Sequence, residues 1–167
     1  SSKAVLLLKL ILVRHGETRL NKEGRIQGLN NTSLAPSGRA QALAIAKTLL
    51  RDLPFHLYTS SVTRARETAQ IIAESIGVPC KLLNGLEEAD AGELEGLTSQ
   101  EMRELYPAFA KLWDRDLGTA QMPGGESLIF VQKRAWAAIS KLVEIHPSET
   151  VVAITHNFTI QTVVCKV

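Results

Sequence analysis

Four short runs of almost uninterrupted apolar residues alternate with longer amphipathic segments along the sequence. The runs cover residues 5–13, 55–59, 80–83 and 150–154. Runs of this length and composition are typical of strands that are buried on both faces, as in parallel sheets. The pattern therefore predicts strands of one central sheet.

Segments with helical periodicity lie between and after these runs. They cover residues 37–51, 62–76, 98–116 and 126–145, and one more helix begins after residue 157. Ser37 is predicted to cap the first of these helices, and Gly77 to end the second. Strands that alternate with helices predict an α/β fold, a three-layer sandwich with a mostly parallel central sheet flanked by helices. No linker or repeat interrupts the pattern, so residues 1–167 are expected to form a single domain.

The composition is that of an ordinary globular protein. The net charge is +2, and basic and acidic residues are interspersed, which argues against nucleic acid as a partner. The apolar run at the N-terminus is interrupted by Lys9 and is too short to span a bilayer. Two cysteines, Cys80 and Cys165, suit a reducing compartment and lack metal-type spacing. We expect a cytoplasmic protein without a membrane segment, and a homodimer is compatible with the sequence.

Two of the predicted strands end in a histidine. The first strand is followed by Arg14 and His15, and the last by Thr155 and His156. Parallel sheets bind ligands beyond the carboxyl ends of their strands, so the two histidines are expected to meet there. The second strand leads into a helix start that carries Arg64, whose planar fork suits phosphate oxygens. The sequence therefore predicts a phosphate-binding crevice at this edge.

Each of these residues also has an ordinary structural explanation. A single histidine after a strand is more often held in a loop by hydrogen bonds than used in catalysis. His56 and His146 receive that assignment, because one precedes a strand and the other stands beside Pro147. From the residues alone, the prediction is a phosphate-binding α/β enzyme.

Six motifs, in order, resemble those of the histidine phosphatase superfamily, also called the phosphoglycerate mutase-like family. They are "LVRHGET" at 12–18, "LNKEGRIQGLNNTSLAPSGRAQA" at 20–42, "YTSSVTRARETAQ" at 58–70, "LEEADAGELEG" at 86–96, "PGGES" at 123–127 and "VVAITHN" at 151–157. They span nearly the whole chain. The resemblance implies a single histidine phosphatase-like domain that acts without a metal or other cofactor.

The resemblance also implies roles for individual residues. His15 would be the nucleophile that forms a phosphohistidine intermediate. Arg14 and Arg64 would clamp the phosphoryl oxygens, with His156 as a further donor.

Neutral donors and an acid complete the implied site. Asn21 and Gln27 would add hydrogen bonds to the phosphoryl group. The general acid would be Glu88 rather than Glu87, because Glu88 stands four residues before Gly92.

The chain departs from the family at two places. Asn157 stands where the family usually has glycine after the second histidine, so its backbone N–H is kept while its side chain narrows the phosphate pocket or adds a contact. The family also continues past the last helix with another strand, and the sequence stops at Val167.

The motifs are shared by hydrolases and mutases of the family. The segment "RIQGLNNTSL" and the short distance from Arg64 to Glu88 favour a phosphomonoester hydrolase acting on a small phosphorylated metabolite. The alternatives are a phosphoglycerate mutase and, less favoured, a non-catalytic phosphate-binding module. Arg19, Lys22 and Arg25 follow the nucleophile and either contact a second anionic group of the substrate or lie in a solvated loop.

Overall fold

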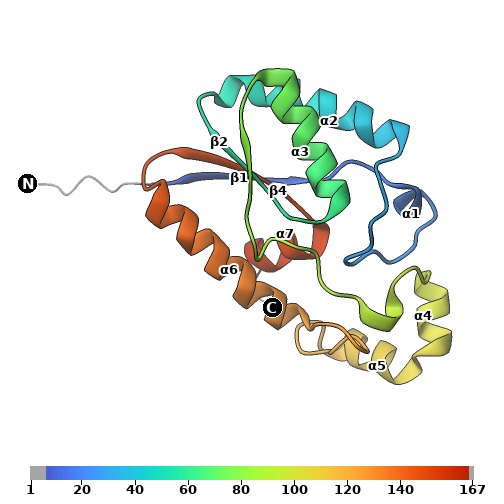
Figure 1. Ribbon diagram of the computed structural model, residues 1–167. Helices are drawn as coiled ribbons and strands as arrows, with labels where there is room; N and C mark the ends of the chain where they lie inside the picture. Colours follow the sequence, from blue (N-terminus) through green and yellow to red (C-terminus); the bar gives the residue numbers. More distant parts are fainter. Residues whose placement is uncertain (1–6, 166–167) are drawn as a thin grey trace, which may run out of the picture.

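A parallel sheet forms the centre of the computed structural model, which describes residues 7–165 (Figure 1). Its strands are β1 (Lys9–Arg14), β2 (His56–Thr59), β3 (Cys80–Leu82) and β4 (Thr150–Thr155), and their spatial order is β1-β4-β2-β3. All three pairings are parallel. Each predicted strand is confirmed with small shifts at its ends, and the start of the first predicted strand, at residues 5 and 6, lies outside the described residues.

Helices surround this sheet in the predicted places. Their bounds are α1 (Arg19–Lys22), α2 (Pro36–Leu49), α3 (Thr63–Ile76), α4 (Ser99–Leu105), α5 (Pro107–Arg115), α6 (Leu128–Ile145) and α7 (Asn157–Val164), with short 3₁₀ turns η1 (Leu50–Asp52) and η2 (Gly92–Leu94). The short helix α1 was not predicted. Within residues 7–165 no helix is long and apolar enough to cross a membrane.

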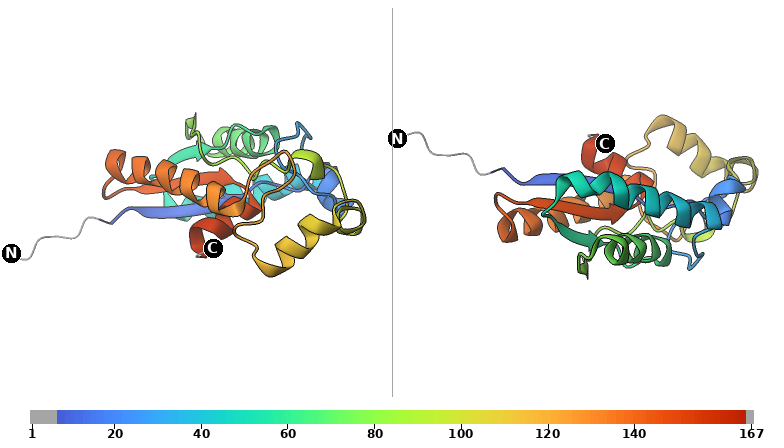
Figure 2. Two further views of the ribbon diagram at one scale, coloured as in Figure 1. Left: turned by 90° about the horizontal axis from the view of Figure 1, so that it is seen from below. Right: turned by 90° about the horizontal axis from the view of Figure 1, so that it is seen from above.

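The sheet separates two layers of helices, with α2 and α3 above the strands and α6 below them in Figure 1, and Figure 2 looks onto the two faces of the sheet. On one face, Val152 and Ile154 of β4 belong to an apolar cluster with residues of α2 and α3. On the other face, Val151 and Ala153 pack with residues of α6. Because successive side chains of a strand point to opposite faces, β4 contributes to both layers of the core. The predicted three-layer sandwich around a parallel sheet is confirmed.

The start of α2 differs from the prediction. The helix begins at Pro36, with Ala35 as a cap that makes no side-chain hydrogen bond. Proline suits this first position, since it lacks the N–H that would be left without a partner. The predicted cap at Ser37 is therefore wrong, and the Ser37 hydroxyl instead donates to the Glu17 carboxylate at 2.6 Å.

The predicted helix at 98–116 is in fact two helices, α4 and α5, which meet at Tyr106. Tyr106 precedes Pro107, and the proline ring disfavours helical backbone at the preceding residue. The capping box expected at the start of this segment is present, because Thr98 and Glu101 each accept a backbone N–H from the other.

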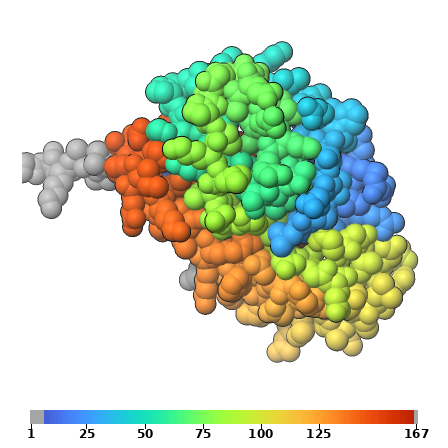
Figure 3. All heavy atoms as spheres, in the orientation of Figure 1, coloured from blue at the N-terminus to red at the C-terminus, as the bar shows by residue number. Residues whose placement is uncertain are grey.

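The α4–α5 segment forms a lobe beside the carboxyl ends of the strands. In Figure 3 this segment, in yellow, lies against the blue segment that follows β1. Backbone hydrogen bonds join the two: Ile26 N donates to Leu97 O at 2.8 Å, and Gly96 N donates to Ile26 O at 2.8 Å. Phe109 and Met102 are buried in the apolar cluster of this lobe. The lobe therefore forms a wall at the edge where the two histidines emerge.

The loop after β1 passes so close to α2 that both sides of the contact are glycine. A Cβ atom on Gly38 would lie 2.1 Å from the carbonyl oxygen of Glu17, and one on Gly16 would lie 2.4 Å from the carbonyl oxygen of Gly38. Both obstacles are backbone atoms, which cannot rotate away. This contact fixes the loop that carries His15.

We expect Gly38→Ala to destabilise the protein, although alanine normally stabilises a helix relative to glycine by about 1 kcal/mol. The added methyl group must displace the backbone at Glu17, which should lower the free energy of unfolding by about 1–3 kcal/mol. Urea unfolding monitored by circular dichroism measures this change. Ala40→Gly at an exposed position of α2 serves as the control for propensity alone. A Gly38→Ala variant that is more stable than the wild type would contradict the close approach.

Candidate active site

The carboxyl ends of β1 and β4 bring His15 and His156 together. The backbone N–H of His15 donates to Thr155 O at 3.1 Å, which continues the ladder between these strands. The two imidazole rings lie with their centroids 5.2 Å apart, at an angle of 52°. The two residues are far apart in sequence, so only the parallel pairing creates this arrangement.

His15 is held as a neutral imidazole with a defined tautomer. Its Nδ1 lies 2.7 Å from the carbonyl oxygen of Gly16, which can only accept, so Nδ1 carries the proton. Its Nε2 therefore has a free lone pair, toward which Arg64 Nε donates at 3.2 Å. Burial lowers the pKa of His15 to about 4, with smaller contributions from the charges of Arg64 and Arg14, against the raising effect of the bond to Gly16. Near pH 7 this ring is a nucleophile rather than a cation.

Arg64 lies at the start of α3 and is 1% exposed. Besides the bond to His15, its Nη2 donates to Gly28 O at 2.8 Å. Burial lowers the pKa of the Arg64 guanidinium, but the carboxylates of Glu88 and Glu95 favour its charged form. Its remaining nitrogen, Nη1, is buried and has no hydrogen-bond partner within residues 7–165.

His156 is fully buried, and its ring is oriented by a hydroxyl group. Ser60 Oγ lies 2.6 Å from His156 Nε2 and accepts the Val62 N–H at 3.2 Å, so its own proton is available to Nε2. The proton of the neutral ring is then on Nδ1, which is buried without a partner in the part of the chain that the structure describes. Burial holds the pKa of His156 well below its usual value. An anion beside His15 would accept from this N–H and from Arg64 Nη1.

Glu88 lies on the N-terminus of α7. Its carboxylate accepts backbone N–H groups from Ala89 at 2.9 Å, Phe158 at 3.1 Å and Thr159 at 3.2 Å. These bonds and the charge of Arg64 favour the ionised form, but burial has the larger effect and raises the pKa of Glu88. A buried carboxyl group of raised pKa suits proton donation near neutral pH.

Glu87 has a different environment from its neighbour. Its carboxylate accepts Gly85 N at 2.7 Å and the Ser61 hydroxyl at 3.0 Å, and it is only half-buried. Arg134 of α6 fixes the turn that separates the two glutamates, because Nη1 donates to Glu87 O at 2.8 Å and Nη2 donates to Glu88 O at 2.9 Å.

All of the predicted site residues except His156 line one cavity of about 150 Å³. These are Arg14, His15, Asn21, Gln27, Arg64, Glu88 and Asn157. Ile26 and Phe158 also line this cavity and belong to a second, apolar cavity of about 170 Å³ that includes Phe109 and Trp113. The site therefore has a polar floor and an apolar wall.

Thr18 orients the two amide side chains, and the sequence analysis missed it. The Thr18 backbone N–H donates to Asn21 Oδ1 at 3.0 Å, and the Thr18 hydroxyl donates its one proton to Gln27 Oε1 at 2.8 Å, so both amide oxygens are engaged on the side of Thr18. The NH₂ groups of both residues are then left to donate into the cavity. A signal was available, because Thr18 precedes Asn21 by three residues and forms the capping box of α1.

Ser60 and Arg134 were also missed. Ser60 directly follows β2, where a polar residue after a buried strand could have been noticed. Arg134 lies far away in sequence within a helix, and nothing in its local pattern distinguishes it from a solvated arginine.

Two predicted residues are more loosely held. Arg14 is exposed, and its guanidinium has no carboxylate partner within residues 7–165, so it is available to a bound anion. The side chain of Asn157 bonds to its own helix, with Oδ1 accepting from Gln161 Nε2 at 3.4 Å.

The three cations of the loop after His15 are already paired. Arg19 contacts Glu23 at 2.6 Å, Lys22 contacts Glu17 at 3.7 Å, and Arg25 contacts Glu101 at 3.0 Å. The ion pairs of Arg19 and Lys22 favour a solvated loop over a second anion-binding group, whereas Arg25 also lines the cavity beside His15.

Comparison with known proteins agrees with this geometry. A family model described as the histidine phosphatase superfamily (branch 1) matches residues 10–167. The chain is 35% identical over 159 residues to phosphoglycerate mutase-like protein 4 of Arabidopsis thaliana, with 93% of this chain and 69% of that protein covered. It is 32% identical over 159 residues to phosphoserine phosphatase 1 of Hydrogenobacter thermophilus, with coverage of 95% and 75%.

A solved structure shows the same fold. Bacillus stearothermophilus YhfR matches with a TM-score of 0.86 at 33% sequence identity, and the match covers 94% of this chain and 78% of that one.

The environment of His15 makes a prediction about its titration. The imidazole should stay neutral from pH 8 down to about pH 5 and gain its proton only near the lowered pKa of about 4. An unfolded chain binds this proton near pH 6.5, so the stability that His15 contributes is complete above that pH. This contribution to the free energy of unfolding is lost as the pH falls from 6.5 to about 4. The chemical shift of the His15 Cε1–H, assigned with His15→Gln, measures the midpoint, and a midpoint near 6.5 would contradict the buried environment.

Proposed function

Because the chain belongs to branch 1 of the histidine phosphatase superfamily, we propose that it is a metal-independent phosphomonoester hydrolase. It would act on a small phosphorylated metabolite through a phosphohistidine intermediate. The observation that carries this proposal is the neutral His15 ring, which lies beside buried N–H groups of Arg64 and His156 that have no partner within residues 7–165.

In the first step, Nε2 of His15 attacks the phosphorus atom and the bond to the leaving oxygen breaks. Arg64 Nε, which donates to this lone pair, turns its N–H to a phosphoryl oxygen as the new bond forms. Arg64 Nη1 and His156 Nδ1 then gain the acceptors that they lack among the described residues. Fixed donors of this kind act where charge develops, and the loss of one typically raises the barrier by about 3–4 kcal/mol.

The remaining donors lie around the same cavity. Arg14 brings an unpaired charge, and Asn21 and Gln27 bring amide NH₂ groups that Thr18 orients. At the start of α7, Glu88 occupies the backbone N–H groups of Phe158 and Thr159, so in this scheme only the N–H of Asn157, the first residue of the helix, is left to the phosphoryl group.

Glu88 would serve both steps as an acid and then as a base. Its raised pKa allows it to hold a proton and give it to the leaving alkoxide. The resulting carboxylate then takes a proton from the water that hydrolyses phosphohistidine. One carboxyl group suffices for both transfers, because the proton that Glu88 gives to the leaving group is replaced by the proton that it takes from water.

The names of the relatives include both hydrolysis and transfer. One is named a phosphoserine phosphatase and another a phosphoglycerate mutase-like protein. Between Arg64 and Glu88 the chain forms only the rest of α3, strand β3 and a turn, so no inserted segment covers the cavity there. Water reaches such a cavity, which favours hydrolysis, and a mutase remains the second candidate.

The apolar wall formed by Ile26, Phe158 and Trp113 would contact the leaving group. Trp113 and Phe158 lie edge to face, with their ring centroids 5.7 Å apart. An aryl ester suits this wall, so p-nitrophenyl phosphate is a reasonable first probe.

We expect the purified chain to release phosphate from p-nitrophenyl phosphate in the presence of a chelator. His15→Ala removes the nucleophile and should lower kcat by at least about 10³-fold. Acid quench of the wild-type reaction should trap an acid-labile phosphoprotein that is absent from the variant. A rate that depends on added metal, or one that survives His15→Ala, would contradict the proposal. Activity only toward phosphoglycerate with its bisphosphate cofactor would support the mutase.

The two adjacent glutamates provide a matched pair for the acid step. Glu88→Gln should reduce kcat for an alkyl phosphate by about 10²–10⁴-fold. The loss should be smaller for p-nitrophenyl phosphate, whose leaving group needs little protonation. Glu87→Gln, which changes the same chemistry one position away, should retain most activity with both esters. Equal losses for the two variants, or a larger loss for Glu87→Gln, would assign the acid differently.

A further inference from the structure

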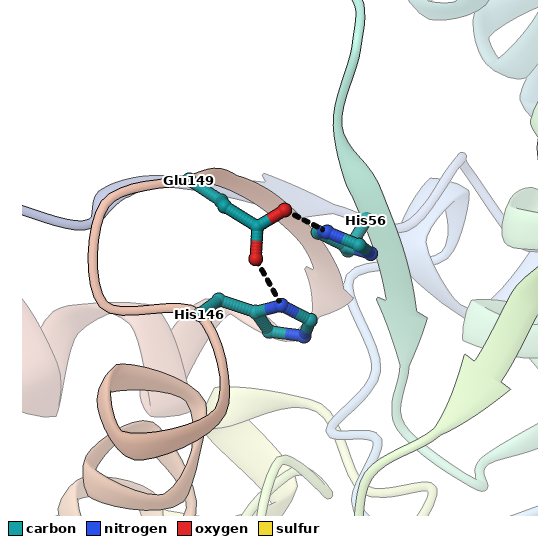
Figure 4. Close-up of side chains that lie close together, drawn as sticks. All are labelled: His56, His146 and Glu149. Atoms are coloured by element: carbon teal, nitrogen blue, oxygen red, sulfur yellow. Dashed lines mark hydrogen bonds and ion pairs between the residues drawn. The ribbon is translucent and has the colours of Figure 1, made fainter.

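A second cluster of chemically active side chains lies at the opposite edge of the sheet from the phosphate cavity. His56 is the first residue of β2, His146 caps the end of α6, and Glu149 directly precedes β4. The strands are parallel, so these residues lie at the amino ends of the strands and the phosphate cavity lies at the carboxyl ends. Figure 4 shows the three side chains converging from their separate elements.

The Glu149 carboxylate bridges the two imidazoles. Its Oε2 lies 2.7 Å from His56 Nε2, and its Oε1 lies 3.1 Å from His146 Nδ1. The rings are stacked, with centroids 3.9 Å apart and an angle of 25°. One nitrogen of each ring and one carboxylate oxygen all lie within 4.8 Å of one another.

We propose that His56, His146 and Glu149 form a binding site for a divalent transition-metal ion of the zinc type. Two imidazole nitrogens and one carboxylate oxygen are a donor set that suits zinc, whereas calcium and magnesium prefer oxygen alone. Around a tetrahedral zinc ion with bonds of about 2.0–2.2 Å, neighbouring ligand atoms lie about 3.4 Å apart. The present separations are short enough for this, but stacked rings direct their lone pairs side by side, so the exposed His56 ring must turn out of the stack to bind the same ion as His146.

The ring of His146 is already oriented for this role. It is buried, and its second nitrogen, Nε2, lies 2.8 Å from the hydroxyl group of Tyr58, which is also buried. A tyrosine hydroxyl can accept a hydrogen bond, so Nε2 can keep its proton and leave Nδ1 free for the metal. Such a partner on the second nitrogen is a regular feature of metal-binding histidines, since it fixes both tautomer and orientation.

The other two ligands leave the ion accessible. The side chains of His56 and Glu149 are 44% and 50% exposed. Three protein ligands with an open fourth position for water would then complete the coordination. The bound ion would tie the α6–β4 connection to the start of β2, and no residue of the phosphate cavity contributes to it.

Zinc binding to the full chain, measured by isothermal titration calorimetry and thermal unfolding, tests this site. With free zinc at about 100 times its Kd, the melting temperature should rise by about 5–10 °C. His56→Ala should abolish the shift, and Glu149→Gln should reduce it. Both ligands are exposed, so these variants should keep the metal-free melting temperature of the wild type within a few degrees.

Two further variants separate this site from other sources of binding. His15→Ala removes an imidazole of the phosphate cavity and should leave the shift unchanged. Glu144→Gln alters an exposed glutamate of α6 that lies outside the proposed site, and it should also leave the zinc-dependent shift unchanged. The proposal is overturned if wild-type protein shows no zinc-dependent shift, if His56→Ala keeps it, or if only His15→Ala removes it.

Discussion

The parallel pairing of β1 with β4 is the constraint on which the site depends. Arg14 lies opposite Thr155 in this register, and the ladder continues through His15 N to Thr155 O. A slip of one residue would turn every side chain of β1 to the other face, and would carry His15 away from His156. The two apolar clusters of the core oppose such a slip, because Leu10 and Leu12 of β1 pack against one cluster and Ile11 and Val13 against the other, and both clusters would have to repack. The burial of apolar side chains thus positions groups that are themselves polar.

Burial then sets the protonation states of those polar groups. The same removal from water lowers the pKa of both imidazoles and raises the pKa of Glu88. A neutral nucleophile and a protonated acid are the two states that the first half of a phosphoryl transfer needs. Removing each of these groups from water costs free energy, which fixed hydrogen bonds offset. His15 bonds to Gly16 O, His156 to the Ser60 hydroxyl, and Glu88 to backbone N–H groups. Burial also lowers the pKa of the Arg64 guanidinium, and the charges of Glu95 and of the ionised form of Glu88 oppose that effect.

The sequence predicts the strands and most helices well because each carries its own periodic or apolar signal. It also predicts which strand ends face one cavity, since parallel strands share a carboxyl edge. The break between α4 and α5 has a local signal in Pro107, although a single helix over 98–116 was predicted. Ser60 and Arg134 are different, because their importance comes from contacts with residues 96 and 46 positions away. His56 and His146 carry no local signal of their stacking, because it depends on how the end of α6 packs beside the start of β2.

The histidine pairs at the two edges of the sheet lie in opposite electrostatic environments. At the carboxyl edge, the histidines are buried next to Arg64, so their neutral form is enforced by desolvation and by a fixed positive charge. At the amino edge, the two histidines share the Glu149 carboxylate, which is half exposed to water and offers a negative ligand to a metal ion. The first environment excludes cations and attracts an anion, and the second does the reverse. Strand β2 connects the two edges directly. His56 is its first residue, and Ser60, which contacts His156, directly follows its last residue. A cation bound at the amino edge would therefore stiffen the strand that orients His156, without adding any group to the phosphate cavity.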